Sequence, residues 1–141
     1  MGGEDLESKV KKIFLICPVR DQNSKEGKIL KNYIAKLESQ GHKVHYPPRD
    51  TNQIDNIGYR ICSDNMRAIS NADEVHIYWN PASKGSLFDL GMTFYANKPI
   101  KLINYNKVKA YEKKEDSKKK PGELKKSFGK VLMYLHEKYD R

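Results

Sequence analysis

Apolar residues along the chain are concentrated in four short runs, separated by longer stretches in which apolar and polar positions follow a helical period. Each run is rich in β-branched and aromatic side chains and stops at a proline or an asparagine. Short apolar runs bounded in this way are typical of buried strands. The pattern therefore predicts strands over Lys12–Cys17, Lys43–Tyr46, Glu74–Trp79 and Ile100–Ile103.

The longer stretches predict amphipathic helices. Between Ser24 and Gln40, four apolar side chains beginning at Leu30 fall at positions i, i+3, i+4 and i+7, which lie on one helix face. Ser24 is a suitable N-cap residue, and Gly41 suits the position just after the helix. Similar stripes predict helices over about Ile57–Asn71, over Ser86–Asn97, and from Pro121 at a first helical position to the end.

Strands that alternate with helices indicate a parallel sheet covered on both faces. We therefore expect an α/β fold: a single-domain three-layer sandwich with a four- to five-stranded, mainly parallel sheet of flavodoxin or Rossmann-like type. A fifth strand near Val108–Tyr111 is left open. The expected organisation is a flexible N-terminus (1–11), an α/β core (12–104), a lysine-rich loop (105–120) and a C-terminal helix (121–141) packed on the core.

This fold predicts where a ligand binds, because open parallel sheets hold ligands beyond the carboxyl ends of their strands, near the point where the strand order reverses. Four segments of the chain follow the expected strands and meet at that edge. They are Pro18–Ser24, Pro47–Asp55, Asn80–Ser86 and Asn104–Asn106.

The charge is distributed unevenly. The 141 residues contain 27 Lys and Arg against 18 Asp and Glu, a net charge of +9. Residues 1–97 hold 13 basic and 12 acidic side chains, and residues 98–141 hold 14 and 6. The basic third suits either a solvated surface or an anionic partner. Nucleic acid is the less expected partner, since almost no aromatic side chains accompany the lysines between Lys113 and Lys120.

Other classes of protein are excluded or disfavoured. Mean hydropathy is −0.83 and no apolar run is long enough to span a membrane. Two cysteines, Cys17 and Cys62, cannot staple a fold and suit buried thiols. The four histidines show no metal-site spacing, and phosphate-loop and dinucleotide motifs are absent, so we expect no metal and no cofactor. Without a targeting signal, the cytoplasm is the expected location.

The segment NPASKGSLFDLG, residues 80–91, carries the most chemistry. Ser83, Lys84 and Ser86 lie where a helix begins, and Gly85 permits a close backbone approach. Free N–H groups and the positive end of a helix favour an anion there. Asp89, one turn into the helix, suits a carboxylate that attacks an electrophilic sugar carbon. The alternative is structural: Ser86-x-x-Asp89 also matches a capping box.

The segment KGSLFDLGMTFYANKPIKLI resembles the signature helix of the nucleoside 2-deoxyribosyltransferase superfamily, which includes the deoxynucleoside 5′-monophosphate N-glycosidases. The residues in register are Ser83, Gly85, Phe88, Asp89, Leu90, Gly91, Lys98 and Pro99. The first strand, FLICPVR, and the helix that carries Asp64 are similar to the corresponding parts of that superfamily. The resemblance covers about residues 12–104.

The resemblance implies roles for particular residues. Asp89 would be the catalytic nucleophile and Asp64 a catalytic acid that engages the sugar or the base. Arg20 and Ser83 would bind a 5′-phosphate. The substrate site would also include Pro18, Gly85, Ser86 and Asn65, of which Asn65 is the alternative to Asp64. The superfamily also implies a homodimer or a higher homo-oligomer, with a nucleoside or nucleotide as the small-molecule substrate.

Two residues depart from the superfamily pattern. Asp89 stands where the family has Glu, which shortens the reach of the carboxylate by roughly 1.3–1.5 Å, and Cys17 replaces a glycine. The expected function is cleavage or transfer of the N-glycosidic bond of a nucleoside or nucleoside 5′-monophosphate. The alternatives are a catalytically inactive nucleotide-binding module of the same fold and a protein that binds nucleic acid or another anionic partner through its basic third.

Overall fold

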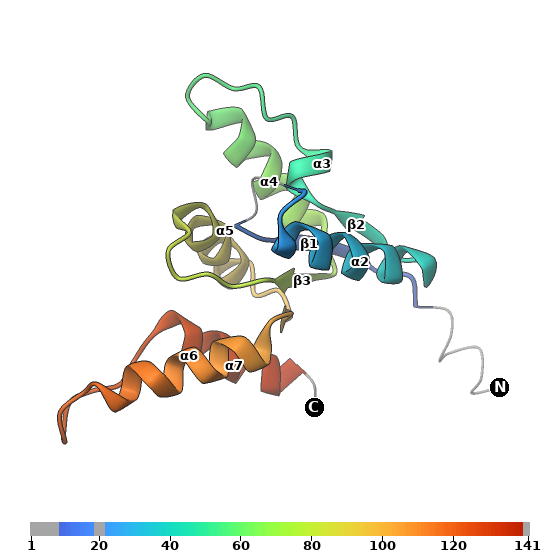
Figure 1. Cartoon of the computed structure of the whole chain (residues 1–141). Coiled ribbons are helices and arrows are strands. Elements are labelled where there is room, and N and C mark those ends of the chain that lie inside the picture. Colours follow the sequence, from blue (N-terminus) through green and yellow to red (C-terminus); the bar gives the residue numbers. More distant parts are fainter. Residues whose placement is uncertain (1–8, 19–21, 140–141) are drawn as a thin grey trace.

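The computed structural model describes residues 9–18 and 22–139, and shows a four-stranded sheet with helices around it (Figure 1). All neighbouring strands are parallel, in the order β2-β1-β3-β4. This confirms the single-domain α/β sandwich of flavodoxin or Rossmann-like type. The strands are β1 (Lys12–Ile16), β2 (Lys43–His45), β3 (Glu74–Ile77) and β4 (Ile100–Leu102).

Six helices surround this sheet in the described residues: five are longer than one turn, and the sixth, of four residues, follows β2. The helices are α2 (Lys25–Ser39), α3 (Pro47–Asp50), α4 (Tyr59–Asn71), α5 (Lys84–Tyr95), α6 (Tyr105–Ser117) and α7 (Phe128–Tyr139). Because β1 connects through α2 to one side of the sheet and β3 lies on its other side, the strand order reverses between β1 and β3. The carboxyl ends of these two strands mark the expected ligand site.

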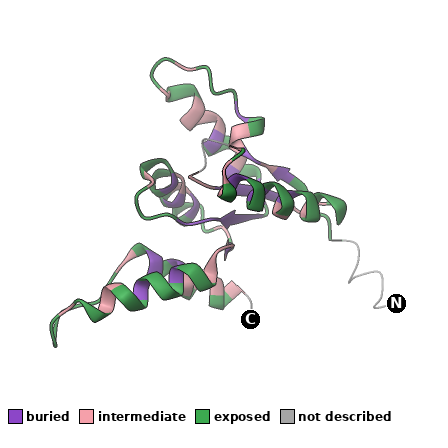
Figure 2. Cartoon of the chain, in the orientation of Figure 1, coloured by how far each residue is buried: buried purple, intermediate pink, exposed green. Residues whose placement is uncertain are grey.

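The sheet is buried on both faces, as its nearly continuous apolar strands require. Side chains alternate between faces along β1, so Ile13 and Leu15 pack with Leu30 and Ile34 of α2. On the opposite face, a larger apolar cluster joins the sheet to α4, α5, α6 and α7. Its members are Phe14, Ile16, Ile69, Ala72, Val75, Ile77, Trp79, Leu90, Ile100, Leu102, Val108 and Leu132. Figure 2 shows the buried strands in purple and the mostly exposed outer faces of the helices in green.

The first helix matches its prediction closely. The Ser24 side chain caps α2 by accepting a hydrogen bond from the Gly27 amide at 3.1 Å. Gly41 follows the helix with φ +93°, a conformation that glycine adopts without steric cost. The capping box predicted at Ser86 is wrong, because α5 begins earlier: Ser83 is its N-cap and accepts a hydrogen bond from the Ser86 amide at 3.1 Å.

The region 105–120, expected to be a loop with a possible strand near Val108–Tyr111, is instead largely helical: Tyr105–Ser117 form α6. Only Val108 and Glu112 of this helix are buried, one turn apart. A buried acidic residue breaks the apolar stripe from which a helix is recognised in sequence. The remaining positions are mostly exposed and polar, so a short inward face is enough to hold the helix against the fold.

The last helix also differs from its prediction, which placed its start at Pro121. It begins at Phe128 instead. Gly122 has φ +84° in a turn, and Leu124 is 73% exposed. Ser127 acts as the cap: its Oγ accepts a hydrogen bond from the Lys130 amide at 3.1 Å and donates one to Glu112 Oε1 at 2.6 Å. Figure 1 shows α6 and α7 side by side along one edge of the molecule.

A buried polar network ties these elements to β3. The Glu74 carboxylate accepts hydrogen bonds from Tyr139 of α7 at 2.8 Å and from Lys11 at 2.9 Å, and contacts His76 Nε2 at 2.6 Å. The other nitrogen of His76 lies 2.6 Å from the Tyr33 hydroxyl on α2. Burial pushes the pKa of Glu74 upward, but these partners outweigh it and lower the pKa to about 2.

The expected flexible N-terminus, residues 1–11, lies mostly outside the described residues, although its last member, Lys11, is held by Glu74. In the described part of the chain no helix is long and apolar enough to cross a membrane.

Candidate active site

A cavity of about 510 Å³ opens at the carboxyl ends of β1, β2 and β3 and contains Asp89. This volume falls within the usual range of small-molecule sites. It collects side chains from the segments after β1 and β2, from α4, and from the start of α5. The lining residues are Cys17, Pro18, Pro47, Pro48, Gln53, Ile61, Asn65, Asn80, Ala82, Ser83, Lys84, Gly85, Ser86 and Asp89. We call it the Asp89 cavity.

The structure brings together most of the residues predicted for the site. Asp89, Asn65 and Ser83 all line the cavity, as do the expected contact residues. Those contact residues are Pro18, Gly85 and Ser86. Arg20 lies outside the described residues. The site is therefore formed at the edge of the sheet where the reversed strand order places it.

Asp64 is not in this group. It does not line the Asp89 cavity and is ion-paired with Arg67 on the same helix. Asn65, the next residue, is 6% exposed and lines the cavity. Because consecutive side chains on a helix point in directions about 100° apart, only one of the two can face the cavity. The geometry assigns that place to Asn65.

The Asn65 side chain is held by a short hydrogen-bonded chain. The Thr51 hydroxyl donates to Asn65 Oδ1 at 2.8 Å and lies 2.8 Å from His45 Nε2. Since the Thr51 proton is used on Asn65, His45 must donate through its Nε2 nitrogen. Burial lowers the pKa of His45, which favours the neutral ring that this arrangement uses. The Asn65 amide group is thus oriented, and no residue that the structure describes accepts a hydrogen bond from its N–H₂ donors.

Burial raises the pKa of Asp89 from 3.8 to about 7. Among the described residues, the structure gives its carboxyl group no ion pair or side-chain hydrogen bond that would offset the desolvation. A carboxyl group with a strongly raised pKa inside a cavity is a frequent property of active sites. Near neutral pH the group is divided between its two protonation states, so it can act as a nucleophile without being permanently charged.

The start of α5 gives the cavity a polar wall. Ser83 Oγ lies 2.9 Å from Ser86 Oγ, and Ser86 is 2% exposed. Gly85 lies between them, and a Cβ atom added there would meet no atom of the protein within 4 Å. Protein packing therefore does not require glycine at this position. Its missing side chain instead leaves the backbone open to a ligand beside Asp89.

Sequence reasoning missed several residues of this cavity. Gln53 and Pro48 belong to the segment after β2, which was expected at the ligand edge, but neither was singled out. The Gln53 amide nitrogen donates to the carbonyl oxygens of Pro47 at 2.9 Å and Thr51 at 3.1 Å. This leaves the Gln53 carbonyl group as an acceptor. The short helix α3, begun by Pro47-Pro48, places this segment along the wall of the cavity, and no periodic signal in four residues predicts that.

No protein-family model matches the chain, and no curated protein is found to be similar to it.

Proposed function

We propose that the protein cleaves, or transfers across, the N-glycosidic bond of a nucleoside or nucleoside 5′-monophosphate, with Asp89 as the nucleophile. The observation that carries this proposal is the partly buried Asp89 carboxyl group, with a pKa of about 7, lining a cavity at the point where the strand order reverses. The resemblance of the α5 segment to the deoxyribosyltransferase superfamily supports it.

The reaction would proceed in two displacements. In the first, a lone pair of the Asp89 carboxylate forms a bond to C1′ of the sugar. The bond between C1′ and the base nitrogen breaks, and that nitrogen takes the electron pair and then a proton from solvent water. In the second, water or another base attacks C1′, releases the Asp89 carboxylate and gives up its own proton to the solvent. Water gives hydrolysis, and a second base gives transfer.

The other side chains of the cavity have supporting roles in this scheme. The Asn65 amide donates hydrogen bonds toward the sugar or the base, and the Gln53 carbonyl accepts one. The Ser83–Ser86 segment at the start of α5, a helix of 12 residues, binds a 5′-phosphate together with Lys84, which lines the same cavity. Since Asp89 must be ionised to attack, the rate is expected to rise as pH increases through about 7.

The experiment is incubation of the protein with a panel of nucleosides and their monophosphates, with chromatographic detection of the free base. We expect release from at least one substrate, loss of release in Asp89→Asn, and little change in the matched variant Asp64→Asn. Mass spectrometry of the quenched reaction should show a sugar adduct on the wild-type chain only. Absence of base release at high protein concentration, with nucleotides nevertheless raising the melting temperature, would contradict an enzyme and favour a nucleotide-binding module.

A separate variant tests whether a 5′-phosphate binds at Ser83. Ser83→Asp keeps a good N-cap residue but places a negative charge where the phosphate is expected. If the monophosphate is a substrate, its KM should rise in this variant at least tenfold more than that of the corresponding nucleoside. Equal changes for both substrates would show that no phosphate binds at Ser83.

A further inference from the structure

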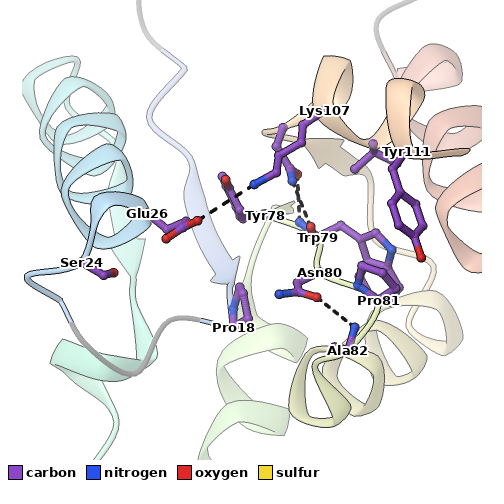
Figure 3. Close-up of a pocket in the computed structure, with 12 residues that line it drawn as sticks. Pro18, Ser24, Glu26, Tyr78, Trp79, Asn80, Pro81, Ala82, Lys107 and Tyr111 are labelled. Carbon is purple, nitrogen blue, oxygen red and sulfur yellow. Dashed lines mark hydrogen bonds and ion pairs between the residues drawn. The ribbon is translucent and has the colours of Figure 1, made fainter. Parts of the chain in front are cut away.

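A second cavity, of about 540 Å³, adjoins the Asp89 cavity. The two share Pro18, Asn80 and Ala82 as lining residues, so they lie next to each other around the carboxyl ends of β1 and β3. The second cavity extends away from Asp89, between the start of α2 and the inner face of α6 (Figure 3). Each cavity alone is large enough for a drug-sized molecule. A nucleoside bound at Asp89 therefore leaves considerable adjoining space.

The floor of this second cavity is apolar, and its backbone is held in place by hydrogen bonds. Tyr78 and Trp79, which follow β3, line it while being only 7% and 5% exposed. Asn104 holds the Trp79 backbone through two hydrogen bonds: its Oδ1 accepts from the Trp79 amide and its Nδ2 donates to the Trp79 carbonyl oxygen, each at 2.9 Å. The backbone polar groups of Trp79 are thus satisfied by the protein rather than by a ligand.

One aromatic side chain of the cavity is accessible. Tyr111 on α6 is 44% exposed and lies beside Pro81 at the cavity (Figure 3). Lys107 stands one turn earlier on the same helix, so the two side chains share a face. A flat, accessible ring beside an apolar surface is a suitable partner for stacking by another flat ring.

The opening of the cavity offers one donor and one acceptor side by side. Lys107 Nζ lies 4.0 Å from Glu26 Oε2 of α2, at the limit of an ion pair, and 5.8 Å from the centre of the Tyr78 ring. Figure 3 shows this pair extending from α6 to α2. The edge of a nucleobase also carries a donor and an acceptor side by side, so it can hydrogen-bond to both side chains.

The same residues argue against other ligands. A phosphate would have to approach the carboxylate of Glu26, with Lys107 as the cavity's one cationic side chain among the described residues. A metal ion would need a group of acidic, cysteine or histidine ligands, and the described part of the chain has no such group of three or more. A planar heteroaromatic ring fits the stacking surface and both polar side chains.

We propose that this second cavity is a nucleobase subsite, in which the ring stacks on Tyr111 and hydrogen-bonds at its edge to Lys107 and Glu26. The identity of the ring rests on the proposed function, which makes a nucleobase either the leaving group or the acceptor. The ring is a nucleobase in both cases. As the leaving group it is the base of the substrate itself, and as the acceptor it is a separate, free base.

Binding can be measured without turnover, because Trp79 is the chain's single tryptophan and lines the cavity. Free adenine, hypoxanthine, uracil and thymine are titrated into the protein, with Trp79 fluorescence and calorimetry as independent measurements. We expect at least one base to bind and to change the emission. Tyr111→Ala should weaken its binding by roughly tenfold or more, and Lys107→Ala by at least threefold. The matched variant Lys109→Ala, exposed on the same helix, should bind like the wild type.

Repeating the titration with Asp89→Asn protein saturated with a nucleoside separates the two sources. Competition assigns the subsite to the substrate's own base, and binding of both ligands together assigns it to an acceptor.

Two results would overturn the subsite: no base binds by either measurement, or binding is lost in Asn65→Ala but unchanged in the Tyr111 and Lys107 variants. If base release occurs without binding here, the proposed function stands and the subsite falls. If bases bind here but no base is released from any substrate, the subsite stands and the proposed function falls.

Discussion

The carboxyl group of Glu112 lies directly against the backbone of Gly129, at the point where α6 and α7 meet. A Cβ atom added to Gly129 would stand 2.9 Å from Glu112 Cδ, a separation that real structures almost never show. Glu112 cannot move aside freely, since it is 7% exposed and bonded to Ser127. A glycine within a helix is normally unfavourable by about 1 kcal/mol relative to alanine, but here the contact requires it.

Gly129→Ala should therefore destabilise the protein although alanine is the better helix former. We expect the free energy of unfolding to fall by about 1–3 kcal/mol, the usual effect of overpacking, as measured by urea denaturation. Adding Glu112→Ala should make the Gly129 substitution much less harmful than it is in the wild type. A stabilising Gly129→Ala would show that the contact relaxes without cost.

The two glycines of α5 offer a test that separates binding from stability. A Cβ at Gly85 or at Gly91 would meet no protein atom within 4 Å, so neither is required by packing. Alanine at either position should raise stability by up to about 1 kcal/mol. Only Gly85 lines the Asp89 cavity, so only Gly85→Ala should reduce base release, by tenfold or more. Equal activities of the two variants would place the ligand elsewhere.

Asp89 should make the protein less stable as pH rises. Its pKa is about 7 when folded against an ordinary value of 3.8, so the folded chain holds the proton more tightly than the unfolded chain. The resulting stability is complete below pH 3.8 and is lost as pH rises through about 7.

Asp89→Asn should remove this dependence. Above about pH 7 the variant should exceed the wild type in stability by up to about 4 kcal/mol, with a much smaller difference near pH 4. Urea denaturation at a series of pH values measures both. Parallel stability curves for the two proteins would mean that Asp89 titrates normally.

Glu74 changes stability with pH in the opposite direction to Asp89. Its pKa is about 2 when folded, against 4.5 ordinarily, so its contribution is present above pH 4.5 and is lost as pH falls through about 2. Glu74→Gln should lower stability at neutral pH by about 2–3 kcal/mol and should flatten the acid limb of the stability curve. The exposed variant Glu123→Gln should keep the wild-type acid limb. An unchanged acid limb in Glu74→Gln would exclude this contribution.

The sequence predicts the sheet and the helices that carry long apolar stripes, because burial on one or both faces determines those patterns. It predicts the edge of the sheet that holds the Asp89 cavity for the same reason. It does not determine which of two adjacent residues, Asp64 or Asn65, faces that cavity. That choice depends on the rotation of α4, and a rotation of one residue reverses it.

The sequence pattern also did not predict the inward face of α6 or the cap residue of α5. The inward face of α6 consists of Val108 and an acid, Glu112, so its buried positions do not look buried. The cap of α5 could be Ser83 or Ser86, since both are good capping residues three positions apart, and the hydrogen bond alone decides for Ser83. The first depends on how α6 packs against the fold, and the second on a local hydrogen bond at the start of α5.

The network around Glu74 also has a consequence for the order in which the chain can fold during its synthesis. Tyr139, which donates to Glu74, comes 65 residues later in the sequence, and α7 also supplies the fully buried Leu132 and the His136 ring that accepts a hydrogen bond from the Leu102 amide. A nascent chain that has exposed all four strands still lacks these partners. We therefore expect the sheet to remain only loosely assembled on the ribosome until α7 has emerged, so that folding is completed at the last helix rather than strand by strand.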